Sequence, residues 1–580
     1  MISSPLILFL DQNNGKALHT RAGRAFYRLA MTRLIIYSAL FLLTIACSKE
    51  TDTPEPDQHD VPLTYRSITI DGTSNGLRYE NVGRNPEIQV SFTTAIDKSS
   101  AAQAVDLVDK EMTKVAVAIS FIDNDSVIVI KSSSPLEWLS KYTLTVSTNL
   151  KSKRGASLLA PVSVNLVTAL DSTDKFPVIP DEELLTLVQK QTFSYFWDFG
   201  HPVSGMARER SSSGDIVTTG GTGFGIMAMI VAVERQFISR EAAVGRLLKI
   251  VRFLRNNATR YHGAFAHWIN GSTGQTQPFS EKDNGADLVE TSFLFQGVLT
   301  ARQYFTKENP EETELRNLIA ELWEAVEWSW FRHNNEEVLY WHWSPDYGWE
   351  MNHKIRGWDE CLITYVLAAS SPTFPVSKTV YDNGWADNGN IRNNGIYYDF
   401  QLPLGPSYGG PLFFAHYSFL GLNPKNLQDQ YADYWQQNVN HAKINHAYCS
   451  RNPAHYLGYS EICWGLSASD GNNGYSAHSP TNDKGVITPT AALSSMPYTP
   501  EESMAALHFF YYKLGNQLWK QYGFIDAFNL TEKWYASDFL AIDQGPIIVM
   551  IENYRTGLLW DLFMGIPEIQ AGLAKLGFTD

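Results

Sequence analysis

The spacing of apolar and polar positions divides the chain into a β-rich segment followed by a much longer helical one. Between residues 63 and 170, short β-branched runs alternate in polarity, and Gly, Asn, Asp and Ser turns separate them; examples are 88–92, 126–130 and 142–146. Short strands at this spacing predict a small β-sandwich. It carries no carboxylate pair or histidine cluster, so a spacer or docking role is expected for it.

A short linker, 171–180, leads into residues 181–580, where apolar positions recur with the helical period. The clearest helical segments are 182–199, 225–236, 241–256, 288–305, 312–330, 361–369, 500–511 and 547–564. So many helices do not fit a four-helix bundle, and an α/α toroid, in which helix pairs cover each other and the ring closes, is the economical packing. The glycine-rich stretch 220–225 predicts tight helix packing, because no strand precedes it as a phosphate-binding loop requires.

The N-terminal region predicts export and a lipid anchor. Residues 31–47 carry a basic residue, Arg33, near their start and continue with an apolar stretch, 34–45, that is too short to span a bilayer. The ending Leu-Thr-Ile-Ala-Cys resembles a bacterial lipobox, in which Cys47 becomes the lipidated first residue. Met31 is then the natural start and residues 1–30 an upstream extension; an ordinary cleaved signal or a short buried segment is the alternative. The polar, proline-punctuated residues 48–62 are a linker, and an outer-membrane lipoprotein facing the surface or the periplasm is expected.

Composition narrows the possible partners. The 580 residues carry 46 basic and 61 acidic side chains, a net charge of -15, which disfavours nucleic acid because phosphate backbones select basic surfaces. The 16 Trp, 28 Tyr and 30 Phe suit a hydroxyl-rich ligand with apolar faces, although most of them are expected in the core. The isolated Cys361, Cys449 and Cys463 are expected to be small buried residues. No metal and no other cofactor is predicted, since the sequence has no CxxC pair or histidine-rich cluster.

Three acidic residues fall at helical spacing near the start of one predicted helix. Asp283, Asp287 and Glu290 occupy positions i, i+4 and i+7, which places them on one helical face, and that face continues with the apolar Leu294. Acids in a first turn can simply complement the helix dipole. Three of them on one face repel each other by a similar amount, so a functional role is favoured.

Two further acid groups stand at predicted helix starts. Asp359 and Glu360 open one apolar helix, and Asp543 precedes Pro546, a residue suited to a first helical turn. Taken alone, each could be a helix cap. In an α/α toroid the inner helices run parallel, so the three acid-bearing starts would meet around one pocket. Such a pocket can keep one carboxyl neutral and another ionised, as glycosidic cleavage requires.

Long motifs extend over nearly all of residues 181–577, among them "SGMARERS", "TGFGIMAM", "GADLVETSFLFQGVLTARQYF", "WDECLITYVLAASSP", "GLSASDG", "YGFIDAFN" and "IDQGPIIVMIENYRTGLLW". They resemble the glucoamylase-like proteins of bacterial carbohydrate-utilisation loci, which include the β-1,2-glucanases of glycoside hydrolase family 144. The preceding segment, with "VSFTTAID" and "SPLEWLSKYTLTV", resembles bacterial Ig-like domains. The resemblance implies an all-α (α/α)6 barrel and cleavage of β-1,2-glucan or sophoro-oligosaccharides with inversion at the anomeric carbon.

The resemblance also assigns roles to individual residues. It implies Glu360 as general acid and Asp543 as general base, with the following residues binding substrate: Asp283, Asp287, Glu290, Trp358, Arg208 and Tyr554. Glu209 stands where relatives are expected to have aspartate.

Three other functions stay open at this point. A non-catalytic lipoprotein could present glycan to uptake proteins of the same surface, and a hydrolase of the same fold could act on another β-glucan. A polysaccharide lyase is less favoured, because its acidic substrates select a basic cleft.

Overall fold

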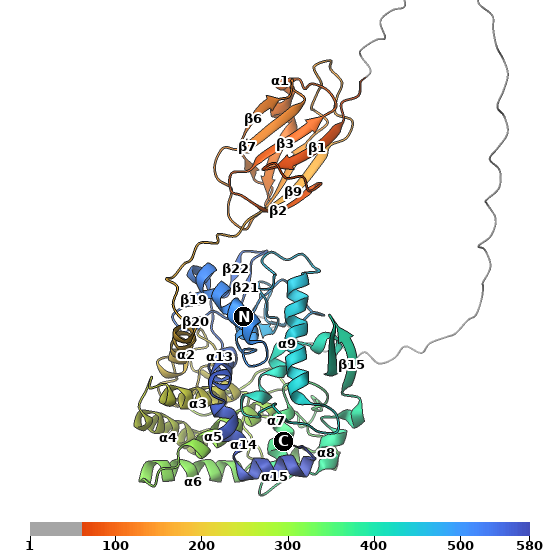
Figure 1. Cartoon of the computed structure of the whole chain (residues 1–580). Coiled ribbons are helices and arrows are strands. Elements are labelled where there is room, and N and C mark those ends of the chain that lie inside the picture. Colours follow the sequence, from red (N-terminus) through yellow and green to blue (C-terminus); the bar gives the residue numbers. More distant parts are fainter. Residues whose placement is uncertain (1–60, 580) are drawn as a thin grey trace, which may run out of the picture. The chain divides into compact units, whose positions relative to one another are not determined.

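The computed structural model describes residues 61–579, a β-sandwich followed by a helix-rich domain (Figure 1). The predicted lipidation site Cys47 and most of the predicted linker 48–62 lie outside these residues. Within the described part of the chain, no helix combines the length and the apolar character that crossing a bilayer requires.

The sandwich consists of two sheets. One has the strand order β1-β3-β7-β6 and is antiparallel throughout; its strands are Tyr65–Ile70 (β1), Glu87–Phe92 (β3), Val127–Ser132 (β7) and Val117–Ile122 (β6). The other has the order β2-β9-β8-β4-β5; its strands are Arg78–Val82 (β2), Val162–Thr168 (β9), Lys141–Val146 (β8), Val105–Asp109 (β4) and Lys114–Val115 (β5). A short helix, Lys98–Ala104 (α1), precedes β4 and is capped by the Asp97 side chain.

Alternation of side chains builds the sandwich core, as the sequence predicts. Along β3, β8 and β9 buried residues occupy every second position, so each strand turns one apolar face inward. Val90, Leu144 and Leu166 are completely inaccessible to solvent.

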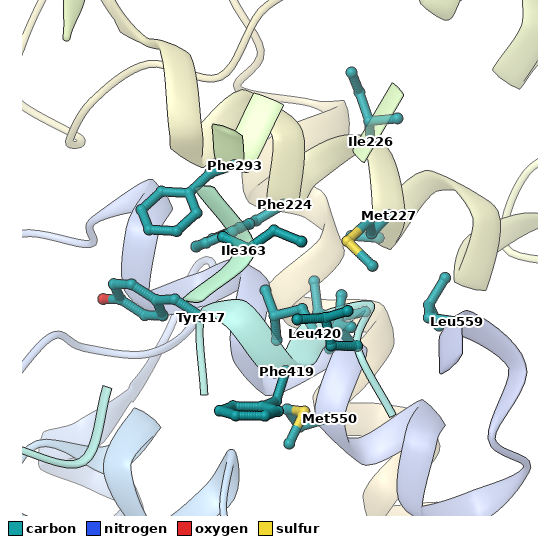
Figure 2. Close-up of a cluster of buried hydrophobic side chains, with 14 of the residues drawn as sticks. Phe224, Ile226, Met227, Phe293, Ile363, Tyr417, Phe419, Leu420, Met550 and Leu559 are labelled. Carbon is teal, nitrogen blue, oxygen red and sulfur yellow. The ribbon is translucent and has the colours of Figure 1, made fainter. Parts of the chain in front are cut away.

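The helix-rich domain has an inner group of helices that are buried almost all round. They are Thr219–Glu234 (α3), Leu288–Tyr304 (α5), Leu362–Ser370 (α7) and Ala541–Arg555 (α13). α3 packs against both α5 and α13, and α5 also packs against α7. Figure 2 shows apolar side chains from several of these elements, including Phe224, Phe293, Ile363 and Met550, in one cluster.

Outer helices bury a single face against this inner group. They are Asp181–Trp197 (α2), Arg240–Asn256 (α4), Pro310–Glu324 (α6) and Pro567–Leu576 (α15). α2 packs on α13, α4 and α6 pack on each other, and α15 packs on α7. The remaining helices are Lys378–Asn383 (α8), Tyr434–Arg451 (α9), Pro489–Leu493 (α10), Pro500–His508 (α11), Gly515–Leu518 (α12) and Leu558–Met564 (α14).

Small sheets of two or three short strands lie in the connections between the helices. They are Ile216–Thr218 (β10) with Trp268–Asn270 (β11) and Thr276–Gln277 (β12); Ala286–Asp287 (β13) with His342–Trp343 (β14); Arg392–Tyr397 (β15) with Phe400–Leu404 (β16); Ala468–Ser469 (β17) with Ser476–Ala477 (β18); Trp519–Lys520 (β19) with Gly523–Phe524 (β20); and Phe528–Asn529 (β21) with Trp534–Tyr535 (β22).

The glycine-rich stretch lies inside a helix. α3 begins at Thr219, six residues earlier than the period of the sequence predicts, and contains the glycines of 220–225. They permit very close packing: a Cβ on Gly223 would lie 2.1 Å from the Phe293 carbonyl oxygen of α5, and one on Gly297 would lie 2.1 Å from the Gly223 carbonyl oxygen. The predicted packing role is therefore correct. The predicted helix start is wrong, and so is the expectation that no strand precedes this stretch, because β10 ends at Thr218 directly before α3.

Two other predicted helices also differ from the structure. The segment 547–564 is two helices, α13 and α14, because Gly557 between them adopts a left-handed backbone with φ of 77°. α13 begins at Ala541, so Asp543 lies in its first turn and Pro546 lies inside the helix rather than opening it. The segment 312–330 stops being α-helical at Glu324, and a 3-10 turn follows at Trp328–Phe331.

Candidate active site

The first acid group is built at the start of α5. Asp287 is the N-cap of this helix: its Oδ1 accepts the backbone N–H groups of Val289 at 3.0 Å and Glu290 at 2.9 Å. Asp283 precedes the helix, so the predicted arrangement of three acids along one helical face is wrong. The three acids are buried all the same, with 4 %, 0 % and 7 % of Asp283, Asp287 and Glu290 exposed.

Glu290 ties the start of α5 to the start of α3. Its Oε2 accepts the backbone N–H of Gly220 at 2.7 Å and the hydroxyl of Thr218 at 3.3 Å. A side chain at Gly220 would collide with this carboxylate. The α3 start also lies against the α13 start, because a Cβ on Gly221 would be 2.7 Å from the Ala541 Cβ.

Two histidines and a tryptophan surround the Asp287 carboxylate. His267 Nδ1 lies 3.2 Å from Asp287 Oδ2 and its Nε2 lies 3.8 Å from Glu290 Oε1. His342 Nε2 lies 3.3 Å from Asp283 Oδ2, and the Trp341 indole donates to Asp287 Oδ2 at 3.3 Å. Burial by itself lowers the pKa of His267, but the Glu290 and Asp287 carboxylates outweigh it and raise that pKa to about 10. His267 is therefore an imidazolium at neutral pH.

The second acid group, Asp359 and Glu360, directly precedes α7 and is partly exposed. Asp359 Oδ1 accepts the Cys361 backbone N–H at 2.8 Å, and the Glu360 carbonyl accepts the Ser418 hydroxyl. Burial raises the pKa of Asp359 to about 7. Burial also raises the pKa of Glu360 well above its usual range, and the negative charges of Asp359, Asp287 and Glu290 raise it further. Glu360 is therefore close to the α5 acids and is protonated at neutral pH.

The third acid group is the pair Asp543 and Asp526, exposed by only 1 % and 2 %. Asp526 Oδ2 accepts the Asp470 backbone N–H at 2.7 Å. Asp526 Oδ1 and both carboxylate oxygens of Asp543 accept no backbone N–H among the described residues, and Asp543 interacts instead with Asp526 and the Tyr417 hydroxyl. Burial raises the pKa of Asp543 to about 7, and raises that of Asp526 well above its usual range together with the Asp543 charge. Two facing carboxyls in this setting share a proton, which leaves Asp526 neutral and Asp543 able to ionise.

Tyr417 lies between the second and third groups. Burial raises the pKa of its hydroxyl far above the usual range, and the charges of both Asp543 and Glu360 add to this. Figure 2 shows the Tyr417 ring at the edge of the apolar cluster with its hydroxyl directed away from the other labelled side chains. Helix starts from α5, α7 and α13 thus bring Glu290, Glu360 and Asp543 to one region.

Partly exposed charged side chains border the buried acids. Arg210 binds Glu209 at 2.9 Å through Nε and Asp470 at 3.1 Å through a terminal nitrogen. Arg210 pairs through its backbone with Leu540, directly before α13. These three side chains are 26 %, 14 % and 20 % exposed, so they are accessible to a ligand that approaches Asp543.

Three predicted substrate-binding residues lie outside this arrangement. The Arg208 guanidinium lies over the Phe199 ring at 4.8 Å and donates to the Gly214 carbonyl at 2.7 Å. Trp358 is 5 % exposed and packs among core aromatics. Tyr554 is in the last turn of α13, eleven residues and therefore about 16 Å along the axis from Asp543.

Sequence reasoning missed several members of the site. Asp470 and Asp526 stand in the motifs "GLSASDG" and "YGFIDAFN", but neither begins a helix, so a search for acids at helix starts passed over them. His267 and Tyr417 lie in connecting segments without any local pattern. Only tertiary contacts bring these four residues to the acids.

Within residues 61–579, two sets of side chains have the spacing of metal ligands: His267, Asp283 and Asp287, and Asp359, Glu360 and Cys361, each with ligand atoms within 4.8 Å of one another. In the first set His267 is protonated and already neutralises the acids, and a metal would require it to lose that proton. The arrangement is therefore accounted for as an ion-paired network.

Two protein-family models match the chain. Residues 65–168 match the family described as bacterial Ig-like domain, and residues 352–567 match the family described as putative glucoamylase. The first match coincides with the predicted sandwich, and the second contains Glu360 and Asp543.

Individual relatives cover most of the helix-rich domain. A curated relative from Parabacteroides distasonis, an exo β-1,2-glucooligosaccharide sophorohydrolase acting at the non-reducing end, is 49 % identical over 418 residues. That match covers 68 % of this chain and 58 % of the relative, so the chain spans little more than half of its length.

Two solved structures are similar in both sequence and fold. An endo-β-1,2-glucanase from Chitinophaga pinensis, solved with sophorotriose and glucose, is 52 % identical over 70 % of this chain and 99 % of that one, with a TM-score of 0.68. A β-1,2-glucanase from Parabacteroides distasonis is 40 % identical over 89 % of this chain and 73 % of that one, with a TM-score of 0.67.

Proposed function

Because the chain belongs to the glucoamylase-like family, with a bacterial Ig-like domain ahead of the family's helix-rich domain, we propose that it is a glycoside hydrolase that cleaves β-1,2-linked glucans or sophoro-oligosaccharides. One observation carries this proposal. Glu360 and Asp543, far apart in the sequence, both act on the Tyr417 hydroxyl through their charges, and both have a raised pKa. The activities of the relatives suggest the linkage.

Glu360 is the general acid in this proposal. Its raised pKa keeps it protonated at neutral pH, so it can give that proton to the glycosidic oxygen as the bond to the anomeric carbon breaks. Asp359, Asp287 and Glu290 maintain this state, because ionised Glu360 would be repelled by their charges.

Asp543 is the general base. With a pKa of about 7 it is partly ionised at neutral pH, and no backbone N–H among the described residues occupies its oxygens. It can therefore accept a proton from the water that attacks the anomeric carbon. Asp526 retains the shared proton and Arg210 favours the ionised form of Asp543.

The different charged groups around Glu360 and around Asp543 favour inversion at the anomeric carbon. After burial, the acids that raise the pKa of Glu360 are Asp359 and those of α5, whereas the acid that raises the pKa of Asp543 is Asp470 and Asp526 lowers it through a hydrogen bond. Two carboxyls only about 5 Å apart, as in a retaining enzyme, would instead strongly raise each other's pKa. A wider separation leaves room for the attacking water.

Incubation of the purified protein with linear β-1,2-glucan is the direct test. We expect sophorose or longer fragments to be released, and the first product seen by proton NMR to be the α-anomer, the outcome of inversion of a β-linkage. Linear β-1,3-glucan and β-1,4-glucan serve as controls. Release from either of these but not from β-1,2-glucan would contradict the linkage, and an initial β-anomer would contradict inversion.

Product length over time resolves the mode of cleavage. Sophorose alone from the first minutes would indicate release from chain ends, and a ladder of fragments would indicate internal cleavage. The relatives include both an exo-acting and an endo-acting protein, so identity alone does not decide between them.

We further propose that the helix-rich domain, 181–580, is an (α/α)6 barrel and that the sandwich, 63–170, spaces it from an outer membrane to which Cys47 is anchored by lipid. The inner and outer helices described above support the barrel, and the signal-like residues 31–47 support the anchor.

The anchor gives a simple prediction. In a bacterial host that lipidates proteins, the parental protein should remain with the membrane fraction, and Cys47→Ala should be soluble or retained as the uncleaved precursor. Cys449→Ala, which changes a buried cysteine of the helix-rich domain, is the control and should fractionate like the parent. A Cys47→Ala protein that is processed to the size of the mature parent and still remains with the membrane would overturn the anchor.

A further inference from the structure

An exposed aromatic ring lies beside the α5 acids. Phe279 is 44 % exposed and stacks on His267, with ring centroids 4.3 Å apart and an angle of 23° between the planes. It also contacts Trp268 edge-on at 4.8 Å. Its backbone N–H bonds to the Asp283 carbonyl at 2.9 Å, which fixes the ring close to the acids. A flat ring held in place beside carboxylates offers an apolar face to a ligand that enters the site.

A second exposed ring lies beside the Asp543–Asp526 pair. Tyr475, 42 % exposed, precedes β18 in the hairpin that β17 begins. Asp470 anchors this hairpin through its backbone N–H to Asp526 and through its carboxylate to Arg210. The turn closes with a hydrogen bond from Gly474 N to Gly471 O at 3.0 Å, which leaves Tyr475 at the hairpin tip.

Charged side chains connect the two rings. Arg208 forms an isolated bridge with Val217 of β10, and Thr218 of β10 pairs with Trp268 of β11. The segment that carries Glu209 and Arg210 and the strand that follows His267 therefore lie on either side of β10. From one ring to the other the partly exposed residues are Phe279, His267, Glu209, Arg210, Asp470 and Tyr475, which we call the rim strip.

We propose that the rim strip binds several consecutive sugar units of a β-linked glucan, with Phe279 and Tyr475 each stacking on one ring. A glucose ring has an apolar face of C–H groups and an edge of hydroxyls. Aromatic faces bind the first, and charged donors and acceptors such as Arg210 and Asp470 bind the second. The strip follows the buried acids, so a chain held along it passes Asp543 and the α5 acids. The inference rests on the proposed function and extends it to named specificity residues.

The test measures binding without turnover. In a Glu360→Gln background, calorimetry with β-1,2-linked glucopentaose should show about tenfold weaker binding after Phe279→Ala or Tyr475→Ala, as expected for loss of one stacked ring. Phe279→Leu, which keeps apolar volume without a flat face, should resemble Phe279→Ala. Tyr475→Phe, which keeps the ring, should bind about as well as the background protein.

Phe374→Ala is the matched control. Phe374 is 38 % exposed but follows the end of α7 opposite to Glu360, so its removal should leave binding unchanged. In the catalytically active chain, Phe279→Ala and Tyr475→Ala should raise KM for long substrates about tenfold with kcat little changed. Thermal unfolding of each variant verifies that it is folded.

The outcomes separate the two proposals. If the parent hydrolyses β-1,2-glucan but both alanine variants bind and turn over pentaose like Phe374→Ala, the rim strip is refuted and the hydrolase remains. If Tyr475→Phe weakens binding as much as Tyr475→Ala, or if Phe279→Leu binds as well as the background protein, ring stacking is refuted. If the parent neither binds nor cleaves β-1,2-glucan, the proposed function fails and the rim strip fails with it.

Discussion

Glu360→Gln should lower kcat on β-1,2-glucan by about a hundred- to ten-thousand-fold, the usual contribution of a positioned general acid. Glutamine has nearly the same shape but cannot protonate the glycosidic oxygen. Oligosaccharide affinity should persist, because the amide still offers hydrogen bonds and relieves repulsion from Asp359, Asp287 and Glu290. Turnover of purified glucan tests the loss of kcat, and calorimetry on the same preparation tests whether oligosaccharide affinity is retained.

Glu501→Gln is the control. Glu501 also lies in the first turn of a helix, α11, but it is exposed. If acids at helix starts act only on the helix dipole, the two substitutions should have similarly small effects. A protein that binds glucan equally well before and after Glu360→Gln, with no turnover in either form, would instead be a glycan-binding protein that presents sugar to uptake proteins.

Asp543→Asn should have an effect of similar size on kcat, because asparagine cannot take a proton from the attacking water. In the parent, kcat/KM should rise as the pH increases through about 7, where Asp543 ionises, and fall at higher pH, where Glu360 loses its proton. The pH dependence of kcat/KM between pH 4 and 10 tests this order. An acidic limb near pH 4 would argue against Asp543 as the base.

The same substitution should stabilise the protein. The folded-state pKa of Asp543 lies above its ordinary value of 3.8, so the folded protein binds this proton more tightly than the unfolded chain. Ionisation therefore costs stability progressively as the pH rises from 3.8 to about 7, and asparagine removes that cost, about 1 to 3 kcal/mol at pH 8.

Urea unfolding at pH 8 and at pH 4 should show the gain in the free energy of unfolding at pH 8 and little gain at pH 4. If the Asp543 charge serves catalysis, the variant should be more stable but inactive. If the carboxylate has a structural role, the protein should become less stable when it is replaced. If Asp543→Asn is less stable than the parent at pH 8, the idea that ionised Asp543 destabilises the fold and is kept for catalysis is contradicted.

The structure also explains why two residues that were predicted to bind substrate, Arg208 and Tyr554, do not lie beside the acids. Arg208 and Arg210 are two residues apart, and motif position alone favours neither. The structure directs Arg208 toward Phe199 and Arg210 toward Glu209 and Asp470. Tyr554 shares a helix with Asp543, but the helical rise places it at the other end.

By itself, the sequence determined the two-part organisation, since strand and helix periods are local properties that each segment carries. It also identified the acid-bearing residues around Asp287, Glu360 and Asp543, because acids beside an apolar helix stand out against their neighbours. Only the tertiary structure decided which polar residues face them. Asp526, Asp470, His267 and Tyr417 follow no local period, and their pKa values and partners depend on burial and on charges from distant segments. Local pattern records which face of an element is apolar; it does not record which distant side chain will lie against it.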